Sequence, residues 1–176
     1  MLRYLVLFAF LVFSSCMSLK IIQHDNTIKL DNNNFQMLDG DYEMLSDTTS
    51  KYYSYSLWGN LNFIEEDTLE NWKYYKVRLT VINKKRINVK VMLDSICIVQ
   101  KNLKGHFKKG YFITKVYSKW KGIPIFCFTS SSSKYQLSLG SNQRLYLDSK
   151  IRLYAEVAIV GVSGDDLEFS NYYNKK

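Results

Sequence analysis

The chain has 176 residues, of which 47% are hydrophobic and 15% aromatic, which suits one globular domain with its own core. Its formal net charge of +8 comes from lysines and arginines scattered along the expected solvent faces, a pattern that indicates solubility. The densest basic cluster, residues 84–86, falls at an expected turn, and an export signal stands at the amino terminus. Both features argue against nucleic acid as a partner.

Residues 1–16 have the layout of a secretory signal peptide. Arg3 precedes an apolar run of about ten residues, which is too short to span a bilayer as a mature helix. Two serines and Cys16 follow directly, and this order resembles a bacterial lipobox, although Phe13 stands where Leu is usual. The resemblance implies that residues 1–15 are removed and that Cys16 carries acyl chains such as palmitate, which would hold the protein in a lipid bilayer. The alternative is an ordinary signal peptide with an incidental cysteine.

Residues 16–34 are expected to form a lipidated tether, because this stretch is polar and lacks sustained periodicity. The exceptions that could add a short edge strand are Ile21, Ile22, Ile28 and Leu30. His24 lies in this polar stretch and is expected to be solvated. Residues 17–20 contain no acidic side chain, and bacterial export to the cell surface often uses acidic residues at these positions. This favours a cell-envelope protein that faces the periplasm.

From residue 35 to 162, apolar and polar residues alternate in short runs separated by turn residues, which is the pattern of an antiparallel β-domain. The expected strands cover residues 51–58, 74–82, 87–93, 96–100, 103–108, 111–117, 119–128, 135–139, 145–147 and 151–159. Short connections without helical crossovers argue against a parallel sheet. We therefore expect an all-β fold of about eight to ten strands in an up-and-down, lipocalin-like barrel, which closure favours over the alternative two-sheet β-sandwich.

Three segments depart from this alternation. Residues 60–71 have apolar residues at helical spacing with acidic residues between them, so they form either one short amphipathic helix or an acidic hairpin loop. Residues 130–133 are four consecutive serines and are expected to form a mobile loop. Residues 163–176 are polar and are expected to form a flexible tail outside the barrel.

Five short motifs recur in a known group of proteins. They are Ser56-Leu57-Trp58, Leu103-Lys104-Gly105, Gly110-Tyr111-Phe112, Gly122-Ile123-Pro124 and Leu145-Tyr146-Leu147-Asp148. With these motifs, residues 57–148 resemble a group of small uncharacterised lipoproteins of Bacteroidetes-type bacteria. The resemblance covers about half of the chain. It implies a signal peptide, a lipid anchor and a β-rich body, and it implies no activity.

The residues that usually carry catalysis are sparse. Nucleophilic catalysis needs a Ser or Cys with a positioned His, and the two histidines are His24, in the expected tether, and His106, expected to face solvent. The sequence has neither a phosphate-binding glycine loop nor paired His and Cys at metal-ligand spacing, so no cofactor or metal is expected. Asp94 and Asp148 each follow Leu and precede Ser at a strand end. They could pair for acid–base work, or each could bond its own turn.

Two cysteines remain after Cys16. The periplasm permits a disulfide between Cys97 and Cys127. Both lie in apolar runs, however, where a free cysteine packs as a small hydrophobic residue.

Three functions fit these observations. The first is a non-enzymatic lipoprotein whose barrel binds a small lipophilic ligand or an envelope partner. The second is a structural or interaction protein whose core is filled by its own side chains. The third is an enzyme acting on saccharide or lipid, which would require Asp94 and Asp148 to act as paired carboxylates.

Overall fold

The computed structural model describes residues 22–31, 33–47, 56–62, 74–123, 127–157 and 160–176. The expected signal peptide and Cys16 lie outside these residues. Within the described part nearly all regular structure is β-strand, as the alternation predicts. None of the helices described is both long and apolar enough to cross a membrane.

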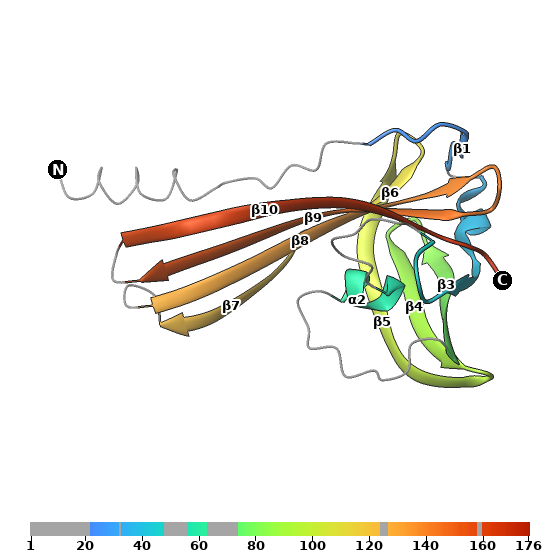
Figure 1. Ribbon diagram of the computed structural model, residues 1–176. Coiled ribbons are helices and arrows are strands. Elements are labelled where there is room, and N and C mark those ends of the chain that lie inside the picture. The colour runs from blue at the N-terminus through green and yellow to red at the C-terminus, as the bar shows by residue number, and fades with distance from the viewer. Residues whose placement is uncertain (1–21, 32, 48–55, 63–73, 124–126, 158–159) are drawn as a thin grey trace.

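Ten strands of the described chain form one antiparallel sheet (Figure 1). They are β1 (Thr27–Ile28), β2 (Gly40–Glu43), β3 (Tyr75–Asn83), β4 (Arg86–Leu93), β5 (Ile96–Lys108), β6 (Tyr111–Thr114), β7 (Tyr117–Ile123), β8 (Cys127–Gly140), β9 (Leu145–Val157) and β10 (Val160–Tyr173). A single-turn 3-10 helix, η1 (Phe35–Leu38), precedes β2, and a short helix, α2 (Leu57–Leu61), precedes β3.

The strands follow one another around the sheet in the order β2-β3-β4-β5-β6-β8-β9-β10. Strands β6 and β7 both pair with the same edge of β8, so they are two halves of one strand interrupted at residues 115–116. Apart from β1, which pairs with β8, each strand therefore pairs with its neighbour in sequence once β6 and β7 are counted as one strand, which confirms the predicted up-and-down antiparallel arrangement. Residues 130–133, expected as a loop, lie inside β8 and pair with both β7 and β9.

The C-terminal residues join the last strand back to the first strands of the sheet. Tyr42 forms an antiparallel bridge with Lys175, and the Glu43 amide donates to the carbonyl of Asn174 at 2.9 Å. The expected flexible tail at 163–176 is therefore wrong, because β10 pairs with β9 and ends in fully buried Tyr173. This return of the sheet to β2 gives a barrel-like body and favours it over the sandwich.

An arm of four strands leaves this barrel. At residues 115–116 the sheet forks: the Lys115 amide still donates to the carbonyl of Lys104 in β5, but beyond it β7 follows β8 alone among the described strands. Figure 1 shows β7 and the long ribbons of β8, β9 and β10 running away from the barrel. The name "arm" is used below for β7 with residues 127–134, 150–157 and 160–168.

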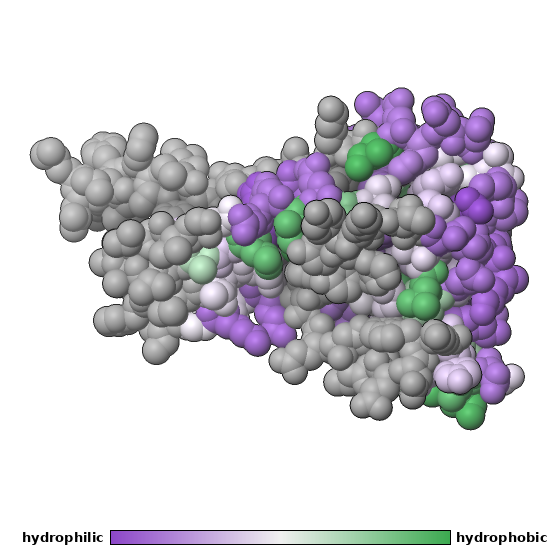
Figure 2. Space-filling model, in the orientation of Figure 1, coloured by the Kyte–Doolittle hydropathy of each residue, from purple (hydrophilic) through white to green (hydrophobic). Residues whose placement is uncertain are grey.

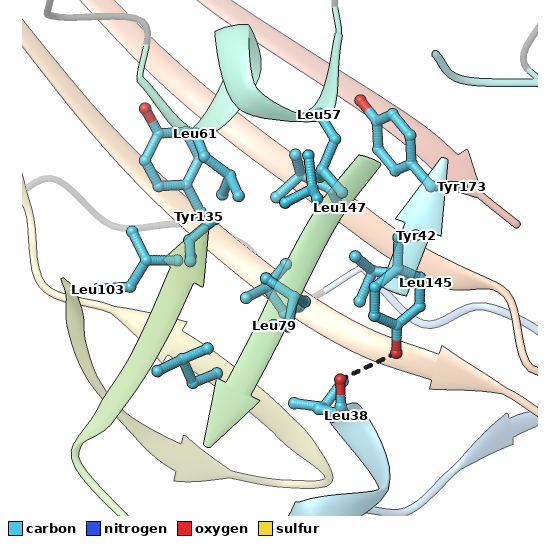
Figure 3. Packing of buried hydrophobic residues seen from close by; sticks show 14 of the residues in the cluster. Leu38, Tyr42, Leu57, Leu61, Leu79, Leu103, Tyr135, Leu145, Leu147 and Tyr173 are labelled. Carbon is cyan, nitrogen blue, oxygen red and sulfur yellow. Dashed lines mark hydrogen bonds between the residues drawn. The ribbon is translucent and has the colours of Figure 1, made fainter. Parts of the chain in front are cut away.

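The barrel interior is packed with leucine and tyrosine side chains (Figure 3). The residues at or below 1% exposure include Leu38, Tyr42, Leu57, Leu61, Leu79, Leu103, Tyr135, Leu145, Leu147 and Tyr173. Helix α2 begins at Ser56, whose hydroxyl accepts from the Gly59 amide at 2.8 Å, and it directs Leu57 and Leu61 into the core. Helix α2 shares only residues 60 and 61 with the helix or acidic loop expected at 60–71, and residues 63–73 lie outside the described chain.

Candidate functional site

Polar side chains on the outer face of β8 and β9 are buried although they point away from the core. Gln136, Ser138 and Asp148 alternate with inward-facing leucines and are nevertheless 0% exposed. The cover is residues 22–30, here called the strap. Its β1 pairs with the end of β8, and the Gln136 side-chain amide donates to the carbonyl of Ile22 at 2.8 Å.

Asp148 is the centre of this buried polar cluster. Its carboxylate lies 2.9 and 3.1 Å from Nε2 of His24 and accepts from Nε2 of Gln136 at 3.0 Å and from the hydroxyl of Ser170 at 2.6 Å. Gln136, Asp148 and Ser170 stand directly opposite one another across β8, β9 and β10, and His24 reaches them from the strap. The imidazole of His24 also stacks on the ring of Tyr146 at 4.4 Å between centroids. These five residues are called the clasp.

Burial and hydrogen bonding act against each other on Asp148. Loss of contact with water raises the pKa of the Asp148 carboxyl, because a buried carboxylate is costly. The hydrogen bond from Ser170, the charge of His24 and the bonds from His24 and Gln136 partly offset that rise. The clasp thus gives a buried acidic group a full set of donors from three separate segments of the chain.

The geometry of the clasp suits attachment better than catalysis. The Ser170 hydroxyl bonds to Asp148, whereas a nucleophilic serine needs a histidine as its base. The Asp148 carboxylate is also fully buried, and the His24 side chain is only 17% exposed. What the clasp does physically is fix the strap on the outer face of the barrel, where it covers polar groups that would otherwise face water.

A second group of contacts joins the β8–β9 turn to the end of β10 and to the segment after β2. The guanidinium of Arg144 lies 4.9 Å from the ring centroid of Tyr172 and 3.5 Å from the carboxylate of Asp47. The Tyr172 hydroxyl donates to the carbonyl of Asp47 at 3.0 Å, and its ring lies 6.2 Å from that of Tyr146. The aromatic row that begins at His24 therefore continues to the segment after β2.

The structure separates the two aspartates singled out in the sequence. Asp148 is buried in the clasp, whereas Asp94 is exposed at the β4–β5 turn with a left-handed φ of 52°. They do not form a carboxylate pair. The expectation of a solvated His24 is also wrong, since His24 bonds to Asp148, and the tether expected at 16–34 packs on the barrel from Ile22 onward. His106 is exposed, as predicted.

Cys97 is a free thiol, so the structure lacks the Cys97–Cys127 disulfide. It is also exposed, at the start of β5, where a buried apolar run was expected. The Cys127 side chain lies outside the described part of the chain, as does Cys16. Among the described residues, no three His, Cys, Asp or Glu side chains are placed to hold a metal ion.

No family model, curated protein or solved structure matches this chain. Function therefore has to be inferred from its residues and their geometry. Sequence reasoning missed Gln136 and Ser170 because neither belongs to a motif. The signal that could have found them is their outward parity on strands, which becomes visible only once the register of β8, β9 and β10 is known.

Proposed function

We propose that the protein is a lipid-anchored protein of the bacterial cell envelope that catalyses no reaction and acts by binding an envelope protein on the arm rather than a ligand inside the barrel. The observation that carries this proposal is the filled interior. Tyr42, Tyr135 and Tyr173 are all 0% exposed inside the barrel, and Leu57 and Leu61 of α2 enter the same space (Figure 3). Small barrels that bind lipophilic ligands keep this space open, so the filled-core alternative is favoured.

Two features support an anchor at Cys16. The Ser-Ser-Cys sequence after the apolar run resembles a lipobox. The strap is fixed to the barrel from Ile22 onward, so a lipid on Cys16 would be joined to the body by six residue steps, about 22 Å when fully extended. A short link to a rigid body would hold that body close to the membrane in a restricted set of orientations.

The arm supports a binding role. The inner face of the arm is the side of the sheet that continues the core face of the barrel. On this side Leu153 is 36% exposed, and Leu167 and the adjoining Phe169 are half-buried. An apolar strip that stays partly exposed on a sheet beyond the core is typical of a surface that meets another protein. We propose that an envelope protein contacts this strip.

Two measurements test the proposal. The native chain grown with a clickable palmitate analogue should incorporate label and remain in the membrane fraction, and the Cys16→Ala variant should lose both properties. A lipophilic fluorescent probe should show no saturable binding to the purified protein. Leu147→Ala, which opens a cavity in the core, serves as the positive control for the probe. Saturable probe binding to the wild-type protein would restore the small-ligand function instead.

A further inference from the structure

We propose that the outer face of the arm lies flat on the lipid headgroups of the membrane that holds Cys16. The outer face is the one on which the clasp lies, opposite the apolar strip of Leu153. This inference rests on the lipid anchor proposed above and adds to it an orientation and a membrane-contacting surface.

The pairing register determines which side chains share the outer face. Residues directly opposite one another in an antiparallel sheet project to the same side, and Trp120, Ser130 and Tyr154 form one such row across β7, β8 and β9. Further rows lead back to the clasp. The outer face of the arm carries Ser118, Trp120, Ser130, Ser132, Lys134, Lys150, Arg152, Tyr154, Asp166 and Glu168.

The chain enters the body on this same face. The carbonyl of Ile22 accepts from Gln136, whose side chain stands on the outer face of β8. From Gln136 to Ser130 the strand rises about 20 Å, and six residue steps from Ile22 back to Cys16 span at most about 22 Å. An acyl chain on Cys16 can therefore enter the bilayer at any point between the clasp and the row of Trp120, so the link is long enough for the outer face of the arm to lie next to the membrane surface.

The side chains of the outer face suit the headgroup layer. Trp120 is 67% exposed and Tyr154 is half-buried, and these amphipathic rings prefer the depth at which water meets hydrocarbon. Most of the charges on the face are paired: Lys150 lies 2.7 Å from Glu168, and Arg152 lies 2.8 Å from Asp166. With Lys134 the face carries one net positive charge. The face can therefore approach zwitterionic and anionic headgroups alike without a large electrostatic penalty.

The remainder of the surface is consistent with this orientation. Figure 2 shows hydrophilic residues gathered over the barrel end that lies away from the arm, which would then face water. The competing contact is the basic β3–β4 turn, where Lys84 and Lys85 are exposed and Arg86 stands directly opposite Lys104. That turn would attract only anionic lipid, whereas the described chain from Ile22 lies on the outer face of β8.

Adjacent serines give a matched test. Ser132 lies on the outer face and Ser131 on the opposite face of the same strand, and both are half-buried. In a chain carrying Cys97→Ser and Cys127→Ser, each serine is replaced separately by Cys and labelled with a small fluorophore. The lipidated protein is reconstituted in vesicles of phosphatidylethanolamine and phosphatidylglycerol that contain headgroup spin-labelled lipid. We expect the Ser132→Cys label to be quenched at least threefold more than the Ser131→Cys label.

Equal quenching of the two labels, or stronger quenching at Ser131→Cys, would overturn the orientation. Stronger quenching of a label at Lys85→Cys than at either serine would place the membrane at the β3–β4 turn and would also overturn it. The anchor is tested separately: the same labels are measured on a chain whose Cys16 is replaced by a hexahistidine tag bound to nickel-chelating lipid. If the native chain takes up no palmitate label but the tagged chain still shows stronger quenching at Ser132→Cys than at Ser131→Cys, the lipid anchor is rejected and the membrane-contacting face is retained.

Discussion

Replacing Asp148 by Ala tests whether the clasp holds the strap on the barrel. The substitution removes the acceptor of three hydrogen bonds, from His24, Gln136 and Ser170. Hydrogen bonds to a charged group contribute about 1.5–3 kcal/mol each, and part of this is returned because the carboxylate no longer has to be desolvated. We therefore expect Asp148→Ala to lower the free energy of unfolding by about 3 kcal/mol.

The partner substitution should cost less. His24→Ala removes one bond and the stacking on Tyr146, but it also lets water reach Asp148, so the expected loss is about 1.5 kcal/mol. Because the two residues are in contact, the double variant should lose at least about 1 kcal/mol less than the sum of the single variants. Urea unfolding followed by circular dichroism measures all three. The control is Asp166→Ala, whose exposed carboxylate pairs on the surface and should matter by less than about 1 kcal/mol.

The pH dependence of the unfolding free energy gives a second test of the role of Asp148. Since burial raises the pKa of Asp148, the folded protein binds more protons than the unfolded chain between the ordinary carboxyl pKa and that of folded Asp148. This residue alone therefore makes stability fall as pH rises through that window, and Asp148→Asn should remove this component. An Asp148→Ala variant within about 0.5 kcal/mol of wild type, with an unchanged pH profile, would refute the role of the clasp.

Three further predictions concern the barrel. The hydrogen bond from Arg78 is the main reason why the pKa of Asp41 is lowered to about 2, so stability present above the ordinary carboxyl pKa is lost as pH falls toward 2. Because the Arg78 side chain is 43% exposed and water screens the pair, we expect this loss to be about 1 kcal/mol. The urea midpoint of Asp41→Asn should therefore vary less than that of the wild type between pH 5 and pH 2, and parallel curves would contradict this. In Gly105→Ala the new Cβ would overlap the backbone carbonyl oxygen of Ile113 and lie 2.8 Å from a ring carbon of Phe112, so the melting temperature should fall by the equivalent of about 1–3 kcal/mol; an unchanged melting temperature would show that the backbone of β6 and the ring both shift at little cost. Deletion of residues 171–176 removes Tyr173 from the core and the bonds to β2, and should abolish the near-ultraviolet circular dichroism signal or lower stability by at least about 3 kcal/mol; a truncated protein as stable as the full chain would argue against closure of the barrel.

The alternation of residue types predicted the β3–β4 hairpin well. Val77, Leu79 and Val81 face inward and stand opposite buried residues of β4. A sheet with one solvent-exposed face and one buried face gives a clear alternation of polar and apolar residues, so this hairpin is visible in the sequence. The all-β class and the sequential pairing follow from the same signal. The start of β5 was less clear, because a bulge at Val91/Met92 shifts the register and leaves Ile96 exposed.

The long strands were harder to predict because both of their faces carry polar residues. The serines at 130–133 have low strand propensity, yet they lie between two paired neighbours that supply the hydrogen bonds. The strand at the C-terminus was missed for a related reason. Asp166 and Glu168 suggest a solvated segment, but they form ion pairs with Arg152 and Lys150 on β9. His24 could not be assigned, because its partner Asp148 is distant in sequence and only tertiary structure brings them together.

Beyond the fork at residues 115–116, the described strands of the arm pair only with one another and not with the barrel strands β3 and β4. The two hairpins of the arm can therefore be lengthened or trimmed during evolution while the core stays intact. The changes must come in pairs on each strand, because loss of one residue from β9 would exchange the sides on which Arg152 and Leu153 project. Each permitted step alters the reach of the arm by about 7 Å, so a lineage can adjust the distance this protein spans without redesigning its hydrophobic interior.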